Sequence, residues 1–552
     1  MEVTPDWIFR ADRVIILATE AMNIPRRQMI LLLLAVAVFS GVAARAQNLG
    51  QTGVTLLRAM TTNLDGSGIR VAQPEAGLDT NNPAMTWEVN PAATGRSPNL
   101  FTYISSNGSS SNYPNSLGSE SGHADSVAGI FYGIPGGVAT NVAHMDNYDA
   151  NYFYNSIIKA TLPASINDRV VNQSFIFNGS TVSDQQTIDS DYDNYAAQFG
   201  ILFVSGVGNG GAVNPPASCY NGIGVGVSDG SLSVGPTLDN GRAKPDIIAP
   251  GGETSFSTPL VSGAAAVLMQ AALRGDGGSD TNSAADIRTI KSLLLNGAIK
   301  PAGWTNNFPS PLDTRYGAGV LNVFNSYEQF AGGKHGYIVS ASVSSGAAHP
   351  PAGNSGTIGA ASGWDFNSIS SMGAGIFSSA TDGVNHYYFN VTNNLSGQNF
   401  TATATLVWNR QQNQTAINNL DLFLYNCASS NLVACSTSLV DNVEHLWLPR
   451  LPQGRYDLQV LKNSGNSVSD SESYALAWEF FSQSLNIANA ETNMALSWPV
   501  YPAGFLVEST ANLASPQHWT TNNLPPPIVT NNQNYILVNA TNAAQFFRLR
   551  RP

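Results

Sequence analysis

Charge is scarce in this chain. Of its 552 residues only 11% are charged, against about 25% in an average globular protein, and the formal net charge is −12. A chain with few cations and an acidic balance lacks the surface that binds phosphate backbones, so nucleic acid is excluded as the expected partner. The 43% apolar content excludes a disordered protein, and the length predicts several domains.

Cysteine is also rare. Three cysteines in 552 residues exclude a scaffold held together by many disulfides. Cys427 and Cys435 lie eight residues apart in a segment rich in predicted strands, and this spacing favours a disulfide across a hairpin. Cys219 is left without a predicted partner, and we expect it to be a small buried residue rather than a catalytic thiol.

Long hydrophobic runs are missing except near the N-terminus. There two arginines precede the apolar run 29–39, and small residues follow it, a pattern typical of a secretory signal peptide. We therefore expect residues 1–46 to be a cleaved leader, with Met22 as the true start; an uncleaved anchor is the alternative. No later segment is expected to span a membrane. The mature chain, 47–552, is therefore predicted to be secreted or periplasmic, with no membrane contact after signal cleavage.

The middle of the chain alternates short β-branched runs with longer segments of helical spacing. The predicted buried strands are residues 68–73, 140–145, 169–175, 200–208 and 222–227. The predicted helices are residues 187–200, 255–273 and 283–298. The second helix is apolar on nearly all faces and is therefore expected to be buried. This alternation predicts an α/β fold with a parallel sheet flanked by helices, whose site lies at the carboxyl ends of the strands.

The remainder of the chain contains only strand patterns. Segments with alternating polar and apolar residues predict an all-β sandwich or jelly-roll domain over residues 336–482 and a small β-module over 483–552, following a domain at 47–335. Four aromatic residues of the sandwich are expected in its core, with a binding face as the alternative: Trp408, Trp447, Tyr456 and Trp478.

Three polar residues stand where such a sheet would expose a site. His123 opens a helix, Asn209 follows a strand in a glycine-rich turn, and Ser255 begins the buried helix. Pro259 is expected in the first turn of that helix, where proline is tolerated. Each polar residue also has an ordinary explanation, as a surface histidine, a turn asparagine or an N-cap serine. Local patterns leave both explanations open.

The three motifs in this order resemble the subtilase family, the subtilisin-like serine peptidases. His123 lies in SGHADSVAG, Asn209 in FVSGVGNGG and Ser255 in GETSFSTPLVSGAAAVLM. The runs VVNQSF, AKPDIIAPGG and YGAGVLNVFNSYEQ are similar to further family segments, and the resemblance covers about residues 66–333. It implies a subtilisin-like catalytic domain.

The family has an acidic residue ahead of the histidine, at the end of the first strand. The matching run VAQPEAG has Glu75 where the family usually has Asp, and Asp79 and Asp65 are the alternatives. The resemblance implies that the carboxylate orients the imidazole and stabilises its charged form.

The resemblance also implies the chemistry. Ser255 attacks a peptide carbonyl with His123 as general base, and Asn209 and the Ser255 backbone N–H bind the oxyanion. Ser174, Phe175 and Gly206 are assigned to the substrate groove, which takes a protein or peptide.

No cofactor and no metal are required for this chemistry. The sequence has two clusters of acidic residues, Asp146/Asp149 and Asp189/Asp191/Asp193. Many subtilases bind structural calcium, and calcium binding is left open for these clusters. The spacing of the second cluster also suits the exposed start of a helix.

Several features depart from the family pattern. Glu253 and Phe177 stand where glycine is usual, and the stretch from Pro250 to Ser255 is much shorter than the usual loop. The segment between Gln47 and Glu75 is too short for the usual pro-domain. Two hypotheses follow: a secreted serine endopeptidase, and a catalytically weak or inactive subtilase scaffold that acts as a secreted binding or adhesion protein.

Overall fold

The fold was analysed in a computed structural model of the full chain. The described residues are 48–77, 86–392, 399–465, 467–482, 485–490, 493–514, 518–530, 533–539 and 544–550. The predicted leader at 1–46, the start at Met22 and the alternative acid Asp79 lie outside the described residues.

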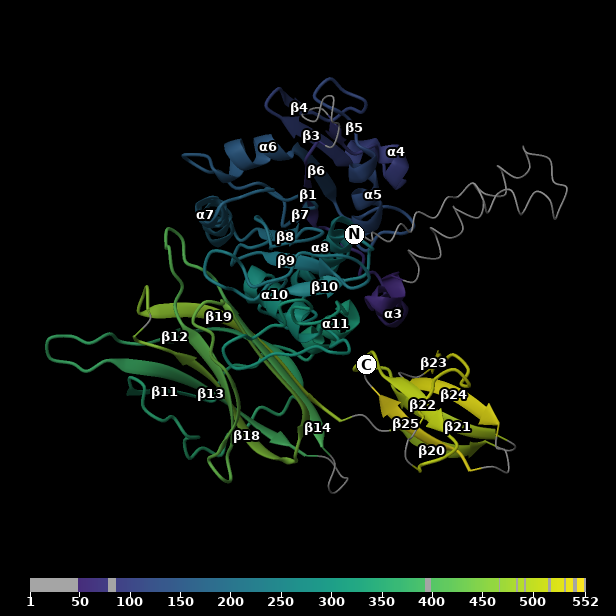
Figure 1. The fold of residues 1–552 in the computed structure, drawn as a ribbon, viewed down its shortest axis with the longest axis vertical. Coiled ribbons are helices and arrows are strands. Elements are labelled where there is room, and N and C mark those ends of the chain that lie inside the picture. Colours follow the sequence, from purple (N-terminus) through teal and green to yellow (C-terminus); the bar gives the residue numbers. More distant parts are fainter. Residues whose placement is uncertain are drawn as a thin grey trace, which may run out of the picture. The chain divides into compact units, whose positions relative to one another are not determined.

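The first half of the chain forms a mainly parallel sheet, which confirms the predicted α/β class (Figure 1). Within the described residues its strand order is β10-β9-β8-β7-β1-β6-β3-β4, and only β4 runs antiparallel to its neighbour. The strands are β1 (Arg70–Glu75), β3 (Phe101–Ser105), β4 (Gly108–Ser110), β6 (His144–Asp149), β7 (Val170–Gln173), β8 (Leu202–Gly206), β9 (Ile223–Val227) and β10 (Ile247–Ala249). A short parallel pair joins β2 (Thr86–Glu88) to β5 (Ser119–Glu120).

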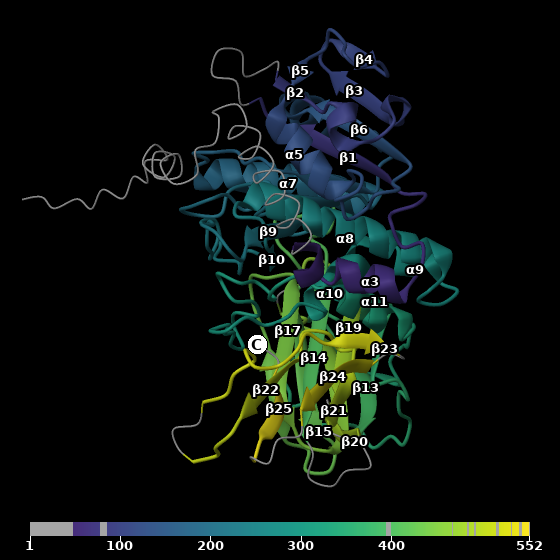
Figure 2. The same ribbon diagram turned by 90° about the vertical axis from the view of Figure 1, so that its right-hand side faces the viewer.

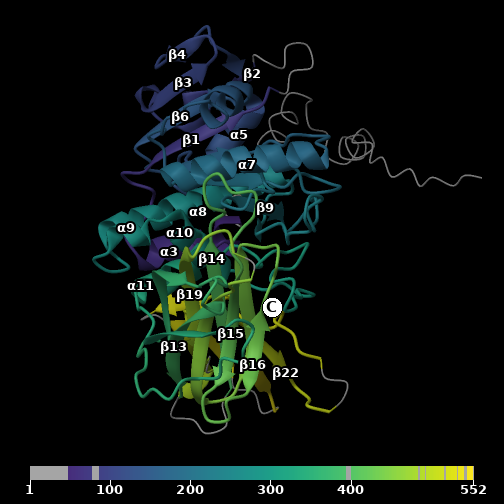
Figure 3. The ribbon, with the colours of Figure 1, turned by 90° about the vertical axis from the view of Figure 1, so that its left-hand side faces the viewer.

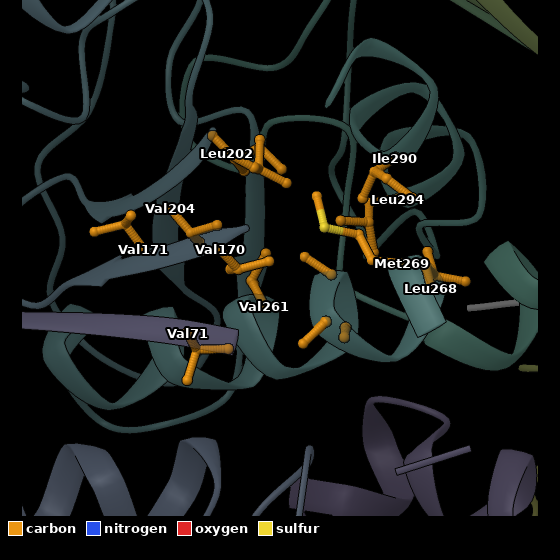
Figure 4. Packing of buried hydrophobic residues seen from close by; sticks show 14 of the residues in the cluster. Val71, Val170, Val171, Leu202, Val204, Val261, Leu268, Met269, Ile290 and Leu294 are labelled. Carbon is orange, nitrogen blue, oxygen red and sulfur yellow. The ribbon is translucent and has the colours of Figure 1, made fainter. Parts of the chain in front are cut away.

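Helices accompany this sheet, and the longest of them is buried. The larger ones are α5 (Gly122–Phe131), α7 (Val182–Phe199), α8 (Thr254–Arg274), α10 (Ile287–Asn296) and α11 (Val323–Ala331). The shorter ones are α3 (Val54–Met60), α4 (Pro91–Thr94), α6 (Ala150–Tyr152), α9 (Thr281–Ala284), the 3₁₀ helix η1 (Pro98–Leu100) and the π-helix η2 (Phe153–Ile158). Figure 4 shows valines of β1, β7 and β8 gathered with Val261 and Met269 of α8.

The expectation that no later segment is long and apolar enough to cross a membrane was wrong in one respect. Helix α8 reaches a mean hydropathy of 1.4 over 18 residues. However, 89% of this window is buried inside the protein, as predicted for a core helix. Its small residues let the sheet approach closely, and the apolar composition serves packing.

Pro259 lies deeper in α8 than predicted. The helix begins at Thr254, so Pro259 occupies its sixth position rather than its first turn. A proline there has no N–H to donate to the carbonyl four residues earlier, which is that of Ser255. The hydroxyl of Ser174 donates to this carbonyl at 2.9 Å, so the acceptor that Pro259 leaves free has a partner in the sheet edge.

After α11 the described residues form strands and no further helix, as predicted. A five-stranded antiparallel sheet has the order β11-β13-β18-β15-β16, and a four-stranded one has the order β12-β19-β14-β17. The strands are β11 (Val339–Ser344), β12 (Ser362–Ser370), β13 (Thr381–Val391), β14 (Phe400–Trp408), β15 (Leu420–Asn426), β16 (Leu432–Ser436), β17 (Val443–Leu451), β18 (Gly454–Lys462) and β19 (Ser471–Phe481). The two sheets share one core that includes Trp408, Tyr456 and Trp478, while Trp447 is only partly buried.

The last strands form two small antiparallel sheets, β20-β21-β24-β23 and β22-β25. The strands are β20 (Asn486–Ala490), β21 (Asn493–Pro499), β22 (Leu506–Thr510), β23 (Ile528–Thr530), β24 (Gln533–Asn539) and β25 (Phe546–Arg550). The predicted domain boundaries at 335/336 and 482/483 stay predictions.

The sandwich and the parallel-sheet region share buried contacts. Helix α10 packs against β14 and β19 (Figures 2 and 3). The buried Asn296 at its end accepts hydrogen bonds from the hydroxyls of Thr403 at 2.9 Å and Thr405 at 3.0 Å. Val407 and Val443 of the sandwich also belong to the same apolar core as the parallel sheet. The two regions therefore stabilise one another.

The predicted disulfide between Cys427 and Cys435 is absent, because both cysteines are free. In the β15/β16 register Cys435 lies opposite Phe423, four residues before Cys427, so the two thiols are separated along the hairpin. Cys219 is free and buried, as expected.

Candidate active site

The carboxyl edge of the parallel sheet carries one open pocket that gathers the predicted site residues. Glu75 is the last residue of β1, His123 the second of α5, and Ser255 the second of α8. Asn209 follows β8. All seven predicted residues line this pocket of about 420 Å³: Glu75, His123, Ser174, Phe175, Gly206, Asn209 and Ser255.

Glu75 contacts the imidazole of His123. The carboxylate oxygen Oε2 lies 3.1 Å from Nδ1, and Glu75 is 1% exposed. Its second oxygen accepts from Nε2 of Gln73 at 3.0 Å, and Gln73 in turn accepts from the hydroxyl of Tyr132 at 2.7 Å. Asp65, the alternative acid, instead accepts from the hydroxyl of Ser67 at 2.6 Å in its own turn.

Sequence analysis missed the supporting role of Gln73. A signal was present, because residues two apart in a strand point to the same face and Gln73 lies two before Glu75. The amide also donates to the carbonyl of Ala124 in α5 at 3.0 Å, so it links the acid to the helix that carries the histidine. Gln73 therefore contacts both Glu75 and the helix that carries His123, although it does not itself line the pocket.

The pKa of His123 is raised above its ordinary value. Burial is the largest influence and acts to lower the pKa. The hydrogen bond and the negative charge of Glu75, together with the charge of Glu253, outweigh it because they stabilise the protonated ring. The ring is thus arranged to accept a proton.

The hydroxyl of Ser255 lies in the pocket but is turned toward the sheet edge. Its Oγ lies 3.4 Å from the carbonyl oxygen of Ser174. His123 and Ser255 are both described residues, and no hydrogen bond joins them. Such bonds are often long or misaligned in unliganded sites, and rotation about one side-chain bond redirects the hydroxyl.

The amide of Asn209 has a fixed orientation. Its oxygen accepts from the backbone N–H of Thr254 at 2.9 Å and from the Thr254 hydroxyl at 2.8 Å. A backbone N–H can only donate, so the oxygen must face the helix and the NH₂ group must face away from it. Asn209 therefore satisfies an N–H group at the start of α8, and its own NH₂ group points away from the helix in the pocket that it shares with Ser255.

Comparison with known proteins identifies the fold around this pocket. Residues 66–319 match the sequence model of the subtilase family. This segment of the chain belongs to the subtilase family. The family is one of serine peptidases, and membership supports a serine-type peptidase.

The chain is also similar to solved structures. A serine protease of Aeromonas sobria is 14% identical, with 90% of this chain and 91% of that chain covered and a TM-score of 0.34. The same protease in complex with a chaperone covers 88% of each chain, at 14% identity and a TM-score of 0.34. Tripeptidyl peptidase 2 is 13% identical, with coverage of 71% and 43% and a TM-score of 0.29. None of the curated proteins compared with the chain matches it.

The short turn before Ser255 is built without a glycine at position 253. Glu253 is extended, with φ −137°, and the left-handed conformation falls on Gly252, with φ +75°. A Cβ at Gly251 would lie 2.7 Å from the backbone nitrogen of Ser257, so glycine is required there too. One oxygen of Asp229 accepts from the N–H groups of both glycines at 2.8 Å. Sequence analysis missed Asp229, because only the fold brings it to this turn.

Phe177 does not block the subtilase pocket. Its ring packs on Tyr154, with centroids 4.9 Å apart, and its backbone N–H donates to the carbonyl of Pro215 at 2.9 Å. The pocket wall is formed instead by Phe175 and Ile176. Phe177 therefore does not narrow this pocket, although it stands where glycine is usual in the family.

The second acidic cluster lies inside α7, and the expectation that it marks an exposed helix start was wrong. Asp189 and Asp193 are buried and form ion pairs at 2.8 Å with Arg242 and Arg410, respectively. These arginines come from loops distant in sequence and neutralise carboxylates that would otherwise be costly to bury. Asp191 accepts from the hydroxyl of Tyr154 at 2.9 Å.

The first acidic cluster is also engaged. Asp146 accepts from Arg70 at 2.9 Å, and Asp149 caps α6 through the N–H of Tyr152. Among the residues that the structure describes, no three His, Cys, Asp or Glu side chains are grouped as a metal ion requires.

Proposed function

We propose that this protein is an exported serine endopeptidase that hydrolyses protein or peptide substrates through an acyl-enzyme on Ser255. The supporting observation is that Glu75, His123, Asn209 and Ser255 line one open pocket in a segment of the subtilase family. A nucleophile, a base, an orienting acid and an amide donor in a single pocket are the groups that acyl transfer needs.

In the proposed mechanism the Ser255 hydroxyl first turns from the Ser174 carbonyl to Nε2 of His123. As Oγ bonds to the substrate carbonyl carbon, His123 takes its proton, and Glu75 stabilises the resulting imidazolium. The oxyanion accepts from the Asn209 amide and from the Ser255 backbone N–H, which lies in the first turn of α8, before intrahelical bonding begins.

Collapse of this intermediate breaks the carbon–nitrogen bond, and His123 gives its proton to the leaving amine. Water then attacks the acyl-enzyme with the same base and releases the acid product. We assign Ser174, Phe175 and Gly206 to the groove that holds the acyl side of the substrate. No cofactor enters these steps, and the mature protein is proposed to act outside the cytoplasm without a membrane partner.

One observation favours the second candidate, a binding or adhesion protein on an inactive scaffold. The Ser255 hydroxyl faces the Ser174 carbonyl and not His123. If this orientation were permanent, the serine would not be activated.

Labelling with a fluorophosphonate probe separates the two candidates. The purified protein spanning residues 47–552 is expected to label, and its Ser255→Ala variant is not. A folded wild type that does not label would favour the binding protein. The position of the label, read by peptide mass spectrometry, tests the assignment to Ser255.

A further inference from the structure

The rim of the pocket carries an acidic side chain with no ionic partner. Glu253 is exposed, lines the pocket and lies two residues before Ser255. Across the described part of the chain, no lysine, arginine or histidine lies within ion-pair distance of its carboxylate. The charge is therefore available to a ligand.

Helix capping does not account for Glu253. It occupies the N-cap position of α8, where acidic residues are often found because they accept from the first N–H groups. Its side chain makes no such bond, and the N–H of Thr254 donates to Asn209 instead. The carboxylate is thus not needed to satisfy the helix end.

The pocket as a whole has an acidic balance. Its other charged groups are Glu75 and His123, which contact one another, and no lysine or arginine lines it. The rest of the wall is apolar or uncharged, including Phe175 and Ile176. A cationic side chain would find one unpaired carboxylate here, and the basic group that shares the lining, His123, is already paired with Glu75.

The position of His123 indicates which part of the substrate meets this charge. In the proposed mechanism the ring protonates the leaving amine, so the residue that follows the cleaved bond passes beside it. Glu253 lines the same pocket as this ring, and Phe256, three residues after Glu253, lies with its ring 5.9 Å from the imidazole, so the carboxylate stands on the side of the pocket that the substrate residue passes.

We infer that Glu253 makes the enzyme select substrates with lysine or arginine immediately after the cleaved bond. This inference rests on the proposed peptidase function. Exposed ion pairs are worth about 1 kcal/mol at most, so we expect roughly a fivefold preference in kcat/KM over an uncharged residue of similar size.

The test is a cleavage-site profile. The wild type, Glu253→Gln and Glu253→Lys are each incubated with a peptide library, and the products are sequenced by mass spectrometry. We expect lysine and arginine to be enriched after the cleaved bond with the wild type, no enrichment with Glu253→Gln, and enrichment of acidic residues with Glu253→Lys. Asp470→Asn, which removes an exposed carboxylate outside the pocket, should keep the wild-type profile.

Fluorophosphonate labelling of each variant shows whether the site is intact. A wild type that neither labels nor cleaves would overturn the proposed function itself. A labelled, active wild type without basic enrichment after the cleaved bond would overturn only the role of Glu253. Enrichment on the acyl side alone, or a preference that persists in Glu253→Gln, would also overturn it.

Discussion

The Glu75 carboxylate lies 3.1 Å from Nδ1 of His123, although its side chain is one methylene longer than that of the aspartate usual in the family. The second carboxylate oxygen is held by Gln73, so the longer side chain is fixed at both ends of its carboxylate. A glutamate can therefore reach the ring while its carboxylate stays fixed, as the proposed orienting role requires.

Glu75→Gln should lower kcat by about 10⁴-fold, the size of the loss when the orienting acid of other serine peptidases is removed. Glu75→Asp should lie between this variant and the wild type, because the shorter side chain moves the carboxylate away from Nδ1. Steady-state kinetics on a chromogenic peptide measure both, with circular dichroism as the control for folding. Full activity in Glu75→Gln would assign the orienting role elsewhere.

The loss of kcat/KM at acidic pH should reflect the protonation of His123. The ring acts as a base only when neutral, and its raised pKa shifts the loss of activity on acidification to higher pH. Glu253→Gln removes one of the charges that raise this pKa, so its acid limb in kcat/KM should move to lower pH. Asp470→Asn serves as the matched control, and equal limbs in wild type and Glu253→Gln would contradict the prediction.

Asp229 is predicted to position the turn that carries the nucleophile. Asp229→Ala removes the acceptor for Gly251 and Gly252, and we expect kcat to fall roughly tenfold with a smaller change in KM, since a misplaced nucleophile can cost this much. Asp229→Asn keeps a side-chain oxygen and should recover most of kcat. If alanine and asparagine behave alike, the two hydrogen bonds do not position the turn.

Asp168 should make the protein less stable at alkaline pH. Burial and the nearby charge of Asp146 raise its pKa to about 9, against about 3.9 in an unfolded chain. The folded state therefore binds this proton more tightly, so its contribution to stability is complete at acidic pH and is lost as pH rises toward 9. Asp168→Asn, which can still donate to Asp146, should unfold at a higher temperature than wild type at pH 9, and the difference should shrink at pH 5.

Asn296 should couple the sandwich to the subtilase segment. Asn296→Ala removes the acceptor shared by Thr403 and Thr405. The buried Thr403 hydroxyl is left unpaired, at a cost of about 1–3 kcal/mol before relaxation, whereas the Thr405 hydroxyl keeps its hydrogen bond of 2.8 Å to Nδ1 of His445. We expect the urea midpoint to fall for fluorescence signals from both regions together. Separate transitions, with only the sandwich destabilised, would contradict the coupling.

Local patterns predicted much of the fold and the candidate site. The β-branched runs before residue 230 became β1, β6, β7, β8 and β9, although β6 begins at His144, four residues later than predicted. The motifs also identified residues that line one pocket, because the end of a parallel strand and the start of the next helix are close along the chain and face one edge of the sheet.

The features that the sequence did not predict depend on contacts between residues that are distant along the chain. The periodicity of α7 gives no sign that Asp189 is buried, because the arginine that neutralises it is 53 residues away. The predicted disulfide between Cys427 and Cys435 was wrong because it required a particular strand register, and the spacing of two cysteines does not determine that register. Asp229 was missed for the same reason, since nothing near it along the chain marks it as a neighbour of Gly252.

The fixed amide of Asn209 has one more consequence. Aspartate is nearly isosteric with asparagine and would satisfy the end of α8 equally well, so helix stability alone does not discriminate between the two. The two residues differ at the side-chain atom that faces away from the helix. Asparagine has an NH₂ group there, which donates hydrogen bonds, whereas aspartate would have a second oxygen, which only accepts them. Under the proposed mechanism, the NH₂ group at position 209 is therefore needed for the substrate and not for the helix.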